Sequence, residues 1–242
     1  MKPATGSSTT WANWVLQGQA RNVLDATDAT HLLVLLDLEE FALVIVTLPH
    51  PAVVVTPRPT WDRTRHIADI AFNDLSLPDA ALIIRGVTAR KVLARERGHF
   101  DLAQAHDALA GASRAFEETL AYMQQRHQFN RPIASFQALK HRCAEHRVGI
   151  EASSVLLAAA TEAAAEQRED WHTSIACARL HASALYMSVS EDCIQLHGGL
   201  GFTWDYPSRL FLKRARLGEV LGGTAAQRKD AVAPHLLRRP KV

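Results

Sequence analysis

The sequence predicts an α+β fold in which a small antiparallel β-domain precedes an antiparallel bundle of four to five helices. Short apolar or alternating runs, separated by Gly, Pro, Asp and Asn, occupy much of residues 11–90. From residue 91 to residue 237 apolar residues recur mainly at three- and four-residue intervals. Short connections between the helical segments favour antiparallel neighbours. We expect residues 1–10 to be disordered and residues 238–242 to form a solvated tail.

Each predicted strand is a short apolar or alternating run bounded by turn-forming residues. The runs cover residues 14–16, 21–24, 31–36, 42–46, 52–56 and 66–72. Asp37-Leu-Glu-Glu40 has the composition of a hairpin turn between two of them. The β-domain is therefore predicted to be an antiparallel sheet or an open barrel with frequent turns.

The first predicted helix has one apolar face. Its residues recur at intervals of three and four and are Leu102, Ala105, Leu109, Ala112, Phe116, Leu120 and Met123. It is expected to end near Phe129, because Pro132 disfavours helical backbone in the residue before it. Ser135 is predicted to cap a second helix that runs to about Gln167.

Three further helices are expected before the tail. Asp170 is predicted to cap a helix that runs to Gln195, and a shorter helix follows Pro207. Thr224-Ala-Ala-Gln227 has the form of a capping box, with Thr at the N-cap and Gln three residues later. It is expected to open the last helix.

Composition places the 242-residue chain among ordinary globular proteins, with 48% hydrophobic and 21% charged residues. A net charge of +2 gives no reason to expect nucleic acid or an acidic membrane as a partner. No signal peptide or bilayer-spanning run is predicted, and the scattered histidines form no metal motif. Three widely spaced cysteines are expected to be reduced thiols in a cytoplasmic protein, in or near the core.

A glycine block ends a long apolar-periodic run. In Gln195-Leu-His-Gly-Gly-Leu-Gly-Phe202, three of four consecutive residues from Gly198 are glycines, and Trp204-Asp-Tyr-Pro207 follows. Glycine allows positive φ and close approach of another group to the backbone. The block by itself fits either a helix stop followed by a turn or the close approach of a flat or phosphorylated ligand.

These residues, with the basic segment after them and Gly222-Gly-Thr224, resemble the C-terminal signature of the acyl-CoA dehydrogenase family. The resemblance covers about residues 11–237 and also includes Arg126-x-x-Phe129 and Gln137. It implies FAD as cofactor, bound between subunits. The family's preceding helical domain and first β-strands have no counterpart here. We expect another chain to supply them, or a longer protein to have lost them.

The resemblance assigns FAD contacts to seven residues. Arg126, Phe129 and Gln137 match positions that reach the flavin nucleotide of a neighbouring subunit. Gln195, Gly198 and Gly199 match positions near its adenine and ribose, and Thr224 matches a position near its phosphate or ring edge. An arginine suits such a site because its planar fork pairs with phosphate oxygens.

The sequence departs from the family where the family places its catalytic carboxylate. Gly222 stands in place of the usual Glu, and the alternative family position corresponds to Phe100. The adjacent Asp101 is the nearest substitute base. Its other interpretation, which the residues favour, is a carboxylate placed near a helix N-terminus by the helix dipole. Glu219, one helical turn before Gly222, is a further candidate.

Three hypotheses follow from the resemblance and its missing base. The first is a subunit that binds FAD and works in α,β-dehydrogenation of an acyl-CoA thioester. A second acyl-CoA dehydrogenase-type chain supplies its base, in a hetero-oligomer expected to be a tetramer. For such heteromers the family implies bulky substrates, such as steroid side-chain acyl-CoA, and electron-transfer flavoprotein or a similar acceptor. The second is a self-sufficient, homo-oligomeric dehydrogenase that uses Asp101. The third is a non-catalytic structural or regulatory subunit without flavin.

Overall fold

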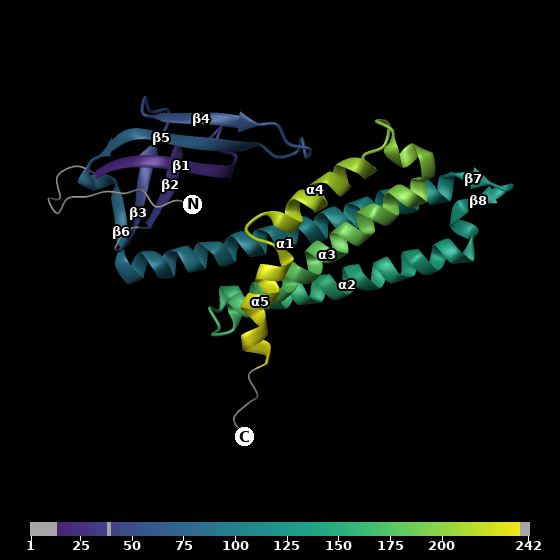
Figure 1. Ribbon diagram of the computed structural model, residues 1–242. Helices are drawn as coiled ribbons and strands as arrows, with labels where there is room; N and C mark the ends of the chain where they lie inside the picture. Colours follow the sequence, from purple (N-terminus) through teal and green to yellow (C-terminus); the bar gives the residue numbers. More distant parts are fainter. Residues whose placement is uncertain (1–13, 38–39, 238–242) are drawn as a thin grey trace, which may run out of the picture. The chain divides into compact units, whose positions relative to one another are not determined.

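The computed structural model describes residues 14–37 and 40–237, and the chain divides after Glu96 into two compact units. The segments expected to be disordered, at residues 1–10, and solvated, at residues 238–242, lie outside the described residues. Strands come first along the chain and long helices follow (Figure 1), so the predicted α+β class is confirmed. The expected domain boundary near residue 90 falls within the first helix.

Two three-stranded antiparallel sheets form the first unit. One sheet has the order β1–β5–β4, from Trp14–Leu24, Ile67–Leu77 and Val53–Arg58. The other has the order β2–β3–β6, from His31–Asp37, Phe41–Thr47 and Leu82–Arg85. Both sheets contribute to one apolar core, which includes Leu16, Leu36, Val44, Val46, Ile70, Phe72 and Leu75.

The strands differ from the predicted ones in two respects. The runs expected at residues 14–16 and 21–24 are parts of the single strand β1, because register shifts after Leu16 and Ala20 carry its pairing with β5 through the intervening residues. Strand β6 was not predicted, since four residues are too few to show a period. The expected turn at Asp37–Glu40 joins two strands that pair in register, although residues 38–39 lie outside the description.

The described residues contain five α-helices, in agreement with the predicted four to five. They are α1 (Gly86–Gln125), α2 (Gln137–Ala165), α3 (Trp171–His197), α4 (Ser208–Val220) and α5 (Ala225–Leu236). A small hairpin of β7 (His127–Gln128) and β8 (Arg131–Pro132) joins α1 to α2. Helix α1 ends four residues before the predicted end at Phe129, because Phe129 and Asn130 adopt positive φ in the hairpin turn.

Close packing of small residues holds α1, α2 and α3 together. Ala105, Ala108, Ala112, Ala160, Ala178 and Ala182 are buried in one cluster with larger residues such as Phe116, Leu157 and Tyr186. A Cβ on Gly111 would lie 2.4 Å from the ring of Tyr186, so the glycine gives that ring its space. All three cysteines are free thiols, and burial raises the pKa of the Cys193 thiol to about 11.

One of three predicted helix caps has the expected hydrogen bonds. Thr224 and Gln227 form the capping box of α5, with both reciprocal bonds present. Asp170 occupies the N-cap position of α3, but it makes no side-chain capping bond and pairs with Arg168 instead. The prediction for Ser135 is wrong, because Ser135 belongs to a 3₁₀ turn (residues 133–135) and the next residue becomes the N-cap of α2.

Candidate functional site

Different physical reasons account for the three glycines after α3. Gly198 has φ of +62°, a backbone conformation that favours glycine. Gly201 is buried, and a Cβ there would lie 2.7 Å from the carbonyl oxygen of Ile194. Gly199 has neither constraint, since a Cβ there would meet no atom within 4 Å. The chain's own packing therefore explains Gly201, whereas Gly199 faces open space that another molecule can enter.

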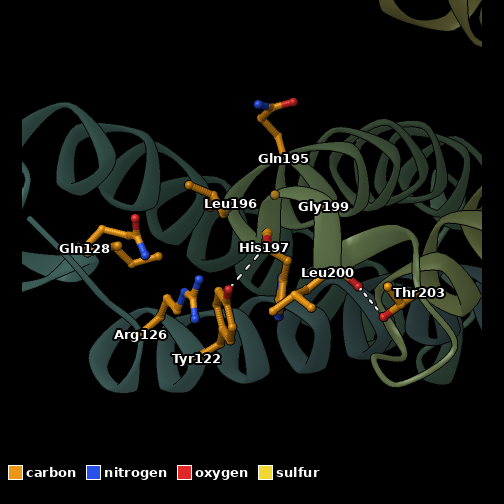
Figure 2. Close-up of a pocket in the computed structure, with 11 residues that line it drawn as sticks. Tyr122, Arg126, Gln128, Gln195, Leu196, His197, Gly199, Leu200 and Thr203 are labelled. Atoms are coloured by element: carbon orange, nitrogen blue, oxygen red, sulfur yellow. Dashed lines mark hydrogen bonds between the residues drawn. The ribbon is translucent and has the colours of Figure 1, made fainter.

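A groove of about 530 Å³ runs along this glycine block, and Figure 2 shows its lining. Arg126 and Gln128 reach it from the segment that follows α1, and Gln195 comes from the last turns of α3. The groove is lined by Tyr122, Arg126, Gln128, Ile133, Gln195, Leu196, His197, Gly198, Gly199, Leu200 and Thr203. The volume lies within the usual range for small-molecule sites. Four of the seven predicted cofactor residues, Arg126, Gln195, Gly198 and Gly199, meet there.

Arg126 is the only Lys or Arg among the residues that line this groove. Its side chain is exposed, and no described residue forms an ion pair with its guanidinium. A guanidinium without a carboxylate partner keeps all its donors available for an anion. Beside the open backbone at Gly199, such a group fits an anionic, flat ligand such as a nucleotide.

An aromatic stack that was not predicted from the sequence lines part of the groove. The rings of Tyr122 and His197 stack at 4.3 Å, and Tyr206 packs edge-on against Tyr122 at 5.4 Å. The Tyr122 hydroxyl also donates to the carbonyl oxygen of His197. Tyr122 lies one helical turn before Arg126, so helical spacing was the available signal for its position.

The other three predicted cofactor residues do not line the groove. Phe129 is 86% exposed in the β7–β8 turn and packs edge-on against Phe136, directly before Gln137. Gln137 is exposed in the first turn of α2. Thr224 caps α5 and is exposed there. Within a single chain these residues are therefore separate from the Arg126 groove.

The position expected to carry a catalytic carboxylate is closed by packing. Gly222 has φ of +73°, and a Cβ there would lie 2.8 Å from a ring carbon of Phe100. Both positions that the family resemblance associates with a base are therefore occupied by one mutually packed pair, a glycine and an aromatic ring. A glutamate at residue 222 would need both a strained backbone and displacement of that ring.

The expectation that Asp101 lies near a helix N-terminus is wrong, because α1 begins at Gly86 and Asp101 lies well inside it, held between two buried arginines. Its carboxylate lies 3.3 Å from Nη2 of Arg228 and 3.9 Å from Nε of Arg179. The side chains of Arg179, Arg228 and Asp101 are only 1%, 8% and 15% exposed. A carboxylate enclosed in this way balances buried positive charge. The second substitute base, Glu219, pairs with Arg216 at 2.9 Å.

The same arginine network fixes the loop around Gly222. Arg228 donates to the carbonyl oxygens of Leu221 and Gly223, and Arg97 donates to that of Gly222 at 2.8 Å. Backbone carbonyls at the end of a helix lack intrahelical donors, and here arginines supply them. Asp101 thus positions Arg228, and Arg228 positions the loop that leads into α5.

Comparison with known proteins agrees with these features. Residues 88–237 match the family described as "Acyl-CoA dehydrogenase, C-terminal domain". The chain is 35% identical over 164 residues to acyl-CoA dehydrogenase IpdE2 of Mycolicibacterium smegmatis, covering 66% of this chain and 45% of that protein. It therefore spans less than half the length of this curated relative.

Solved structures match the fold along almost the whole chain. The ChsE4–ChsE5 complex from Mycobacterium tuberculosis gives a TM-score of 0.86 at 23% identity, with 99% of this chain and 64% of that one covered. The Tcur3481–Tcur3483 steroid ACAD gives 0.82 at 25% identity, with coverage of 94% and 61%. With its family match over more than half the chain, its two-part fold and its glycine block, the protein belongs to the acyl-CoA dehydrogenase family.

Proposed function

We propose that this chain is a base-deficient subunit of a heteromeric, FAD-dependent acyl-CoA dehydrogenase. The observation that carries the proposal is the packing of Gly222 against Phe100, which leaves no carboxylate at either expected position. The ion pairs of Asp101 with Arg179 and Arg228 support a structural role for the nearest alternative base. A second family chain must then supply the group that accepts the α-proton of the thioester.

FAD is the proposed cofactor, and the residues of the Arg126 groove fit part of it. The exposed guanidinium of Arg126 suits a pyrophosphate oxygen, and the open backbone at Gly199 accepts a flat group without steric conflict. When bound, FAD supplies a hydride acceptor for the substrate β-carbon. Phe129, Gln137 and Thr224 are proposed to contact cofactor in the assembled complex, since they lie outside the groove of the single chain.

In the proposed reaction, one chain supplies the catalytic base and the other supplies residues that bind the cofactor. A carboxylate of the second chain would take the α-proton and the bound cofactor would supply the acceptor for the β-hydride, which leaves a carbon–carbon double bond between the two carbons. This chain contributes a positively charged cofactor surface and holds the loop at Gly222 rigid through Arg97 and Arg228. An electron-transfer flavoprotein or a similar acceptor is proposed to reoxidise the cofactor. The proposed compartment is the cytoplasm.

The proposed substrate class is a bulky acyl-CoA, such as a steroid side-chain thioester. The support comes from relatives, namely a solved complex of two different chains and a protein described as a steroid ACAD. A pocket assembled from two chains can be wider than one enclosed by a single chain. The hetero-oligomeric state is proposed on the same grounds.

The test compares the purified chain with a complex formed by co-expression with a family chain that carries Glu before Gly-Thr. We expect flavin absorbance and acyl-CoA oxidation in the complex and neither in the isolated chain. Arg126→Gln should lower the flavin content of the complex, whereas Arg114→Gln, inside α1 and outside the groove, should leave it unchanged. Acyl-CoA oxidation by the isolated chain would refute the proposal that this chain lacks a catalytic base. An assembled complex without flavin would instead support a structural subunit.

A further inference from the structure

Strand β2 leaves one edge of its sheet open. Among the residues that the structure describes, β2 pairs with β3 alone. The amide of Leu48 donates to the carbonyl oxygen of Thr30, so these two residues form a hydrogen-bonded pair that continues the β2–β3 register. Such pairs alternate along an antiparallel ladder, so the odd-numbered residues of β2 direct their backbone N–H and C=O groups toward the open edge. These residues are His31, Leu33, Leu35 and Asp37.

The other edges of the two three-stranded sheets carry features that oppose the addition of a strand. Strand β1 has register shifts after Leu16 and Ala20, β4 contains Pro57, which has no amide hydrogen, and β6 has only four residues. Strand β2 instead pairs with β3 in unbroken register over seven residues and contains no proline, lysine or arginine. It is therefore the edge best suited to pair with another strand.

The residues with outward backbone groups also share one face of the sheet. Leu32 and Leu36 belong to the apolar core, so the side chains of the odd-numbered residues point to the opposite face. Leu33 is 58% exposed and lies opposite Ile45 of β3, which is 38% exposed. An exposed apolar pair beside open backbone groups favours contact with a second apolar strand.

We propose that two copies of this chain join their β2 strands in antiparallel orientation, across a two-fold axis at Val34. In this register Leu33 faces Leu35 of the partner subunit, and His31 faces Asp37 of the partner subunit. Every outward N–H and C=O of the four odd-numbered residues then gains a hydrogen-bond partner. A shift by two residues would leave His31 or Asp37 unpaired. The contact is isologous and uses the open edge of both copies, so it closes at a dimer.

The order of side chains along β2 favours a second copy as the partner strand. The apolar pair of Ile45 and Leu33 continues into Leu35 and Leu43 of the partner subunit, which makes an apolar row across four strands. At each end of the ladder an imidazole faces a carboxylate, an arrangement that favours association when the imidazole is protonated. A ladder of seven residues is short compared with a standard interface, so we expect a reversible dimer. This inference does not depend on the proposed function.

Two measurements on the full chain test the contact. Sedimentation equilibrium should show a reversible shift from 26.7 kDa to twice that mass as concentration rises. Over the same range, hydrogen exchange followed by NMR should slow at the amides of Leu33 and Leu35, which point outward. The amide of Val34 bonds to β3 and should stay protected at every concentration, which makes it the internal reference.

A lysine at the edge should prevent the contact. Leu33→Lys places a charge in the middle of the apolar row in both copies, and we expect it to raise the dissociation constant about tenfold or more. Val54→Lys is the matched control, because Val54 is 48% exposed on an edge strand of the other sheet. It should dimerise as the wild-type chain does. Circular dichroism checks that both variants remain folded.

A charge exchange tests the register. His31→Glu sets like charges opposite each other at both ends and should weaken the dimer about tenfold. Adding Asp37→Arg to the same chain should restore it, because each glutamate then faces an arginine of the partner subunit. No restoration by the second substitution overturns the register.

The location of the protected amides decides whether the edge pairs with itself. Exchange at Leu33 and Leu35 that is independent of concentration overturns the proposal, even where the chain dimerises through another surface. A dimer unaffected by Leu33→Lys overturns it as well. Protection of these amides only in a complex with a second family chain assigns the edge to a strand of that chain and overturns pairing between two copies.

Discussion

The substitution Asp101→Asn tests whether Asp101 stabilises the fold or acts as a catalytic base. Asparagine keeps the volume and one acceptor oxygen of aspartate, so the substitution removes mainly the charge. The charge that it leaves behind is deeply buried, since Arg179 and Arg228 both lie against Asp101 and are almost fully enclosed. We therefore expect Asp101→Asn to destabilise the helical unit.

The size of the effect follows from burial and from the hydrogen bonds that remain. Removing one partner of a buried ion pair costs about 3–5 kcal/mol. Arg179 keeps carbonyl partners at Gln104 and Gly218, and Arg228 keeps those at Leu221 and Gly223. Because these bonds remain, we expect the loss in free energy of unfolding to be near the lower end of that range, about 3 kcal/mol. A loss of this size lowers the Tm by about 6–12 °C for a unit of this size.

Thermal unfolding followed by far-UV circular dichroism measures this change. Asp107→Asn is the matched control, because Asp107 pairs with Arg214 on the same helical unit but both side chains are 28% exposed. A partly exposed pair contributes only about 1 kcal/mol or less, so the control should lose much less stability. A Tm unchanged in Asp101→Asn, together with loss of acyl-CoA oxidation in the assembled enzyme, would refute the anchor and support the base.

Three further substitutions test separate parts of the structure. Gly199→Ala should leave the Tm unchanged but reduce the flavin absorbance of the complex. Gly201→Ala should instead lower the free energy of unfolding by about 1–3 kcal/mol, because its Cβ would overlap the backbone of α3. Equal Tm values for the two variants would contradict this prediction. Burial, and then the charge of Arg142, lowers the pKa of His146, so the folded protein should lose stability as pH falls below about 6.5. His146→Gln should flatten that part of the stability–pH curve, and an unchanged slope would count against it. Thr224→Ala should cost about 1 kcal/mol and speed hydrogen exchange in α5, with equal exchange rates as the opposing result.

Local pattern was enough to predict the fold class and part of the groove. The period of the apolar residues depends on backbone geometry alone, so strands before residue 82 and helices after it could be identified without tertiary contacts. Gly198 and Gly199 marked the end of α3 for the same local reason. The capping box at Thr224 needed only the spacing of two side chains.

Local pattern failed where an element was short or where competing partners decided the outcome. Strand β6 has only four residues, and it is stabilised by antiparallel pairing with the edge of β3. Ser135 had the chemistry of a cap, but a 3₁₀ turn moved the start of α2 past it. The stack of Tyr122 on His197 joins residues 75 positions apart, and no local spacing encodes such a contact.

The sequence by itself determined the order of the two units, the glycine block and the absence of a glutamate at residue 222. Only the tertiary structure decided what those residues do, because their neighbours come from distant parts of the chain. It packed Phe100 into the space that a side chain at residue 222 would take, and it placed Asp101 between two arginines that lie far along the sequence. A carboxylate's role depends on the charges and solvent around it, and these are properties of the folded chain.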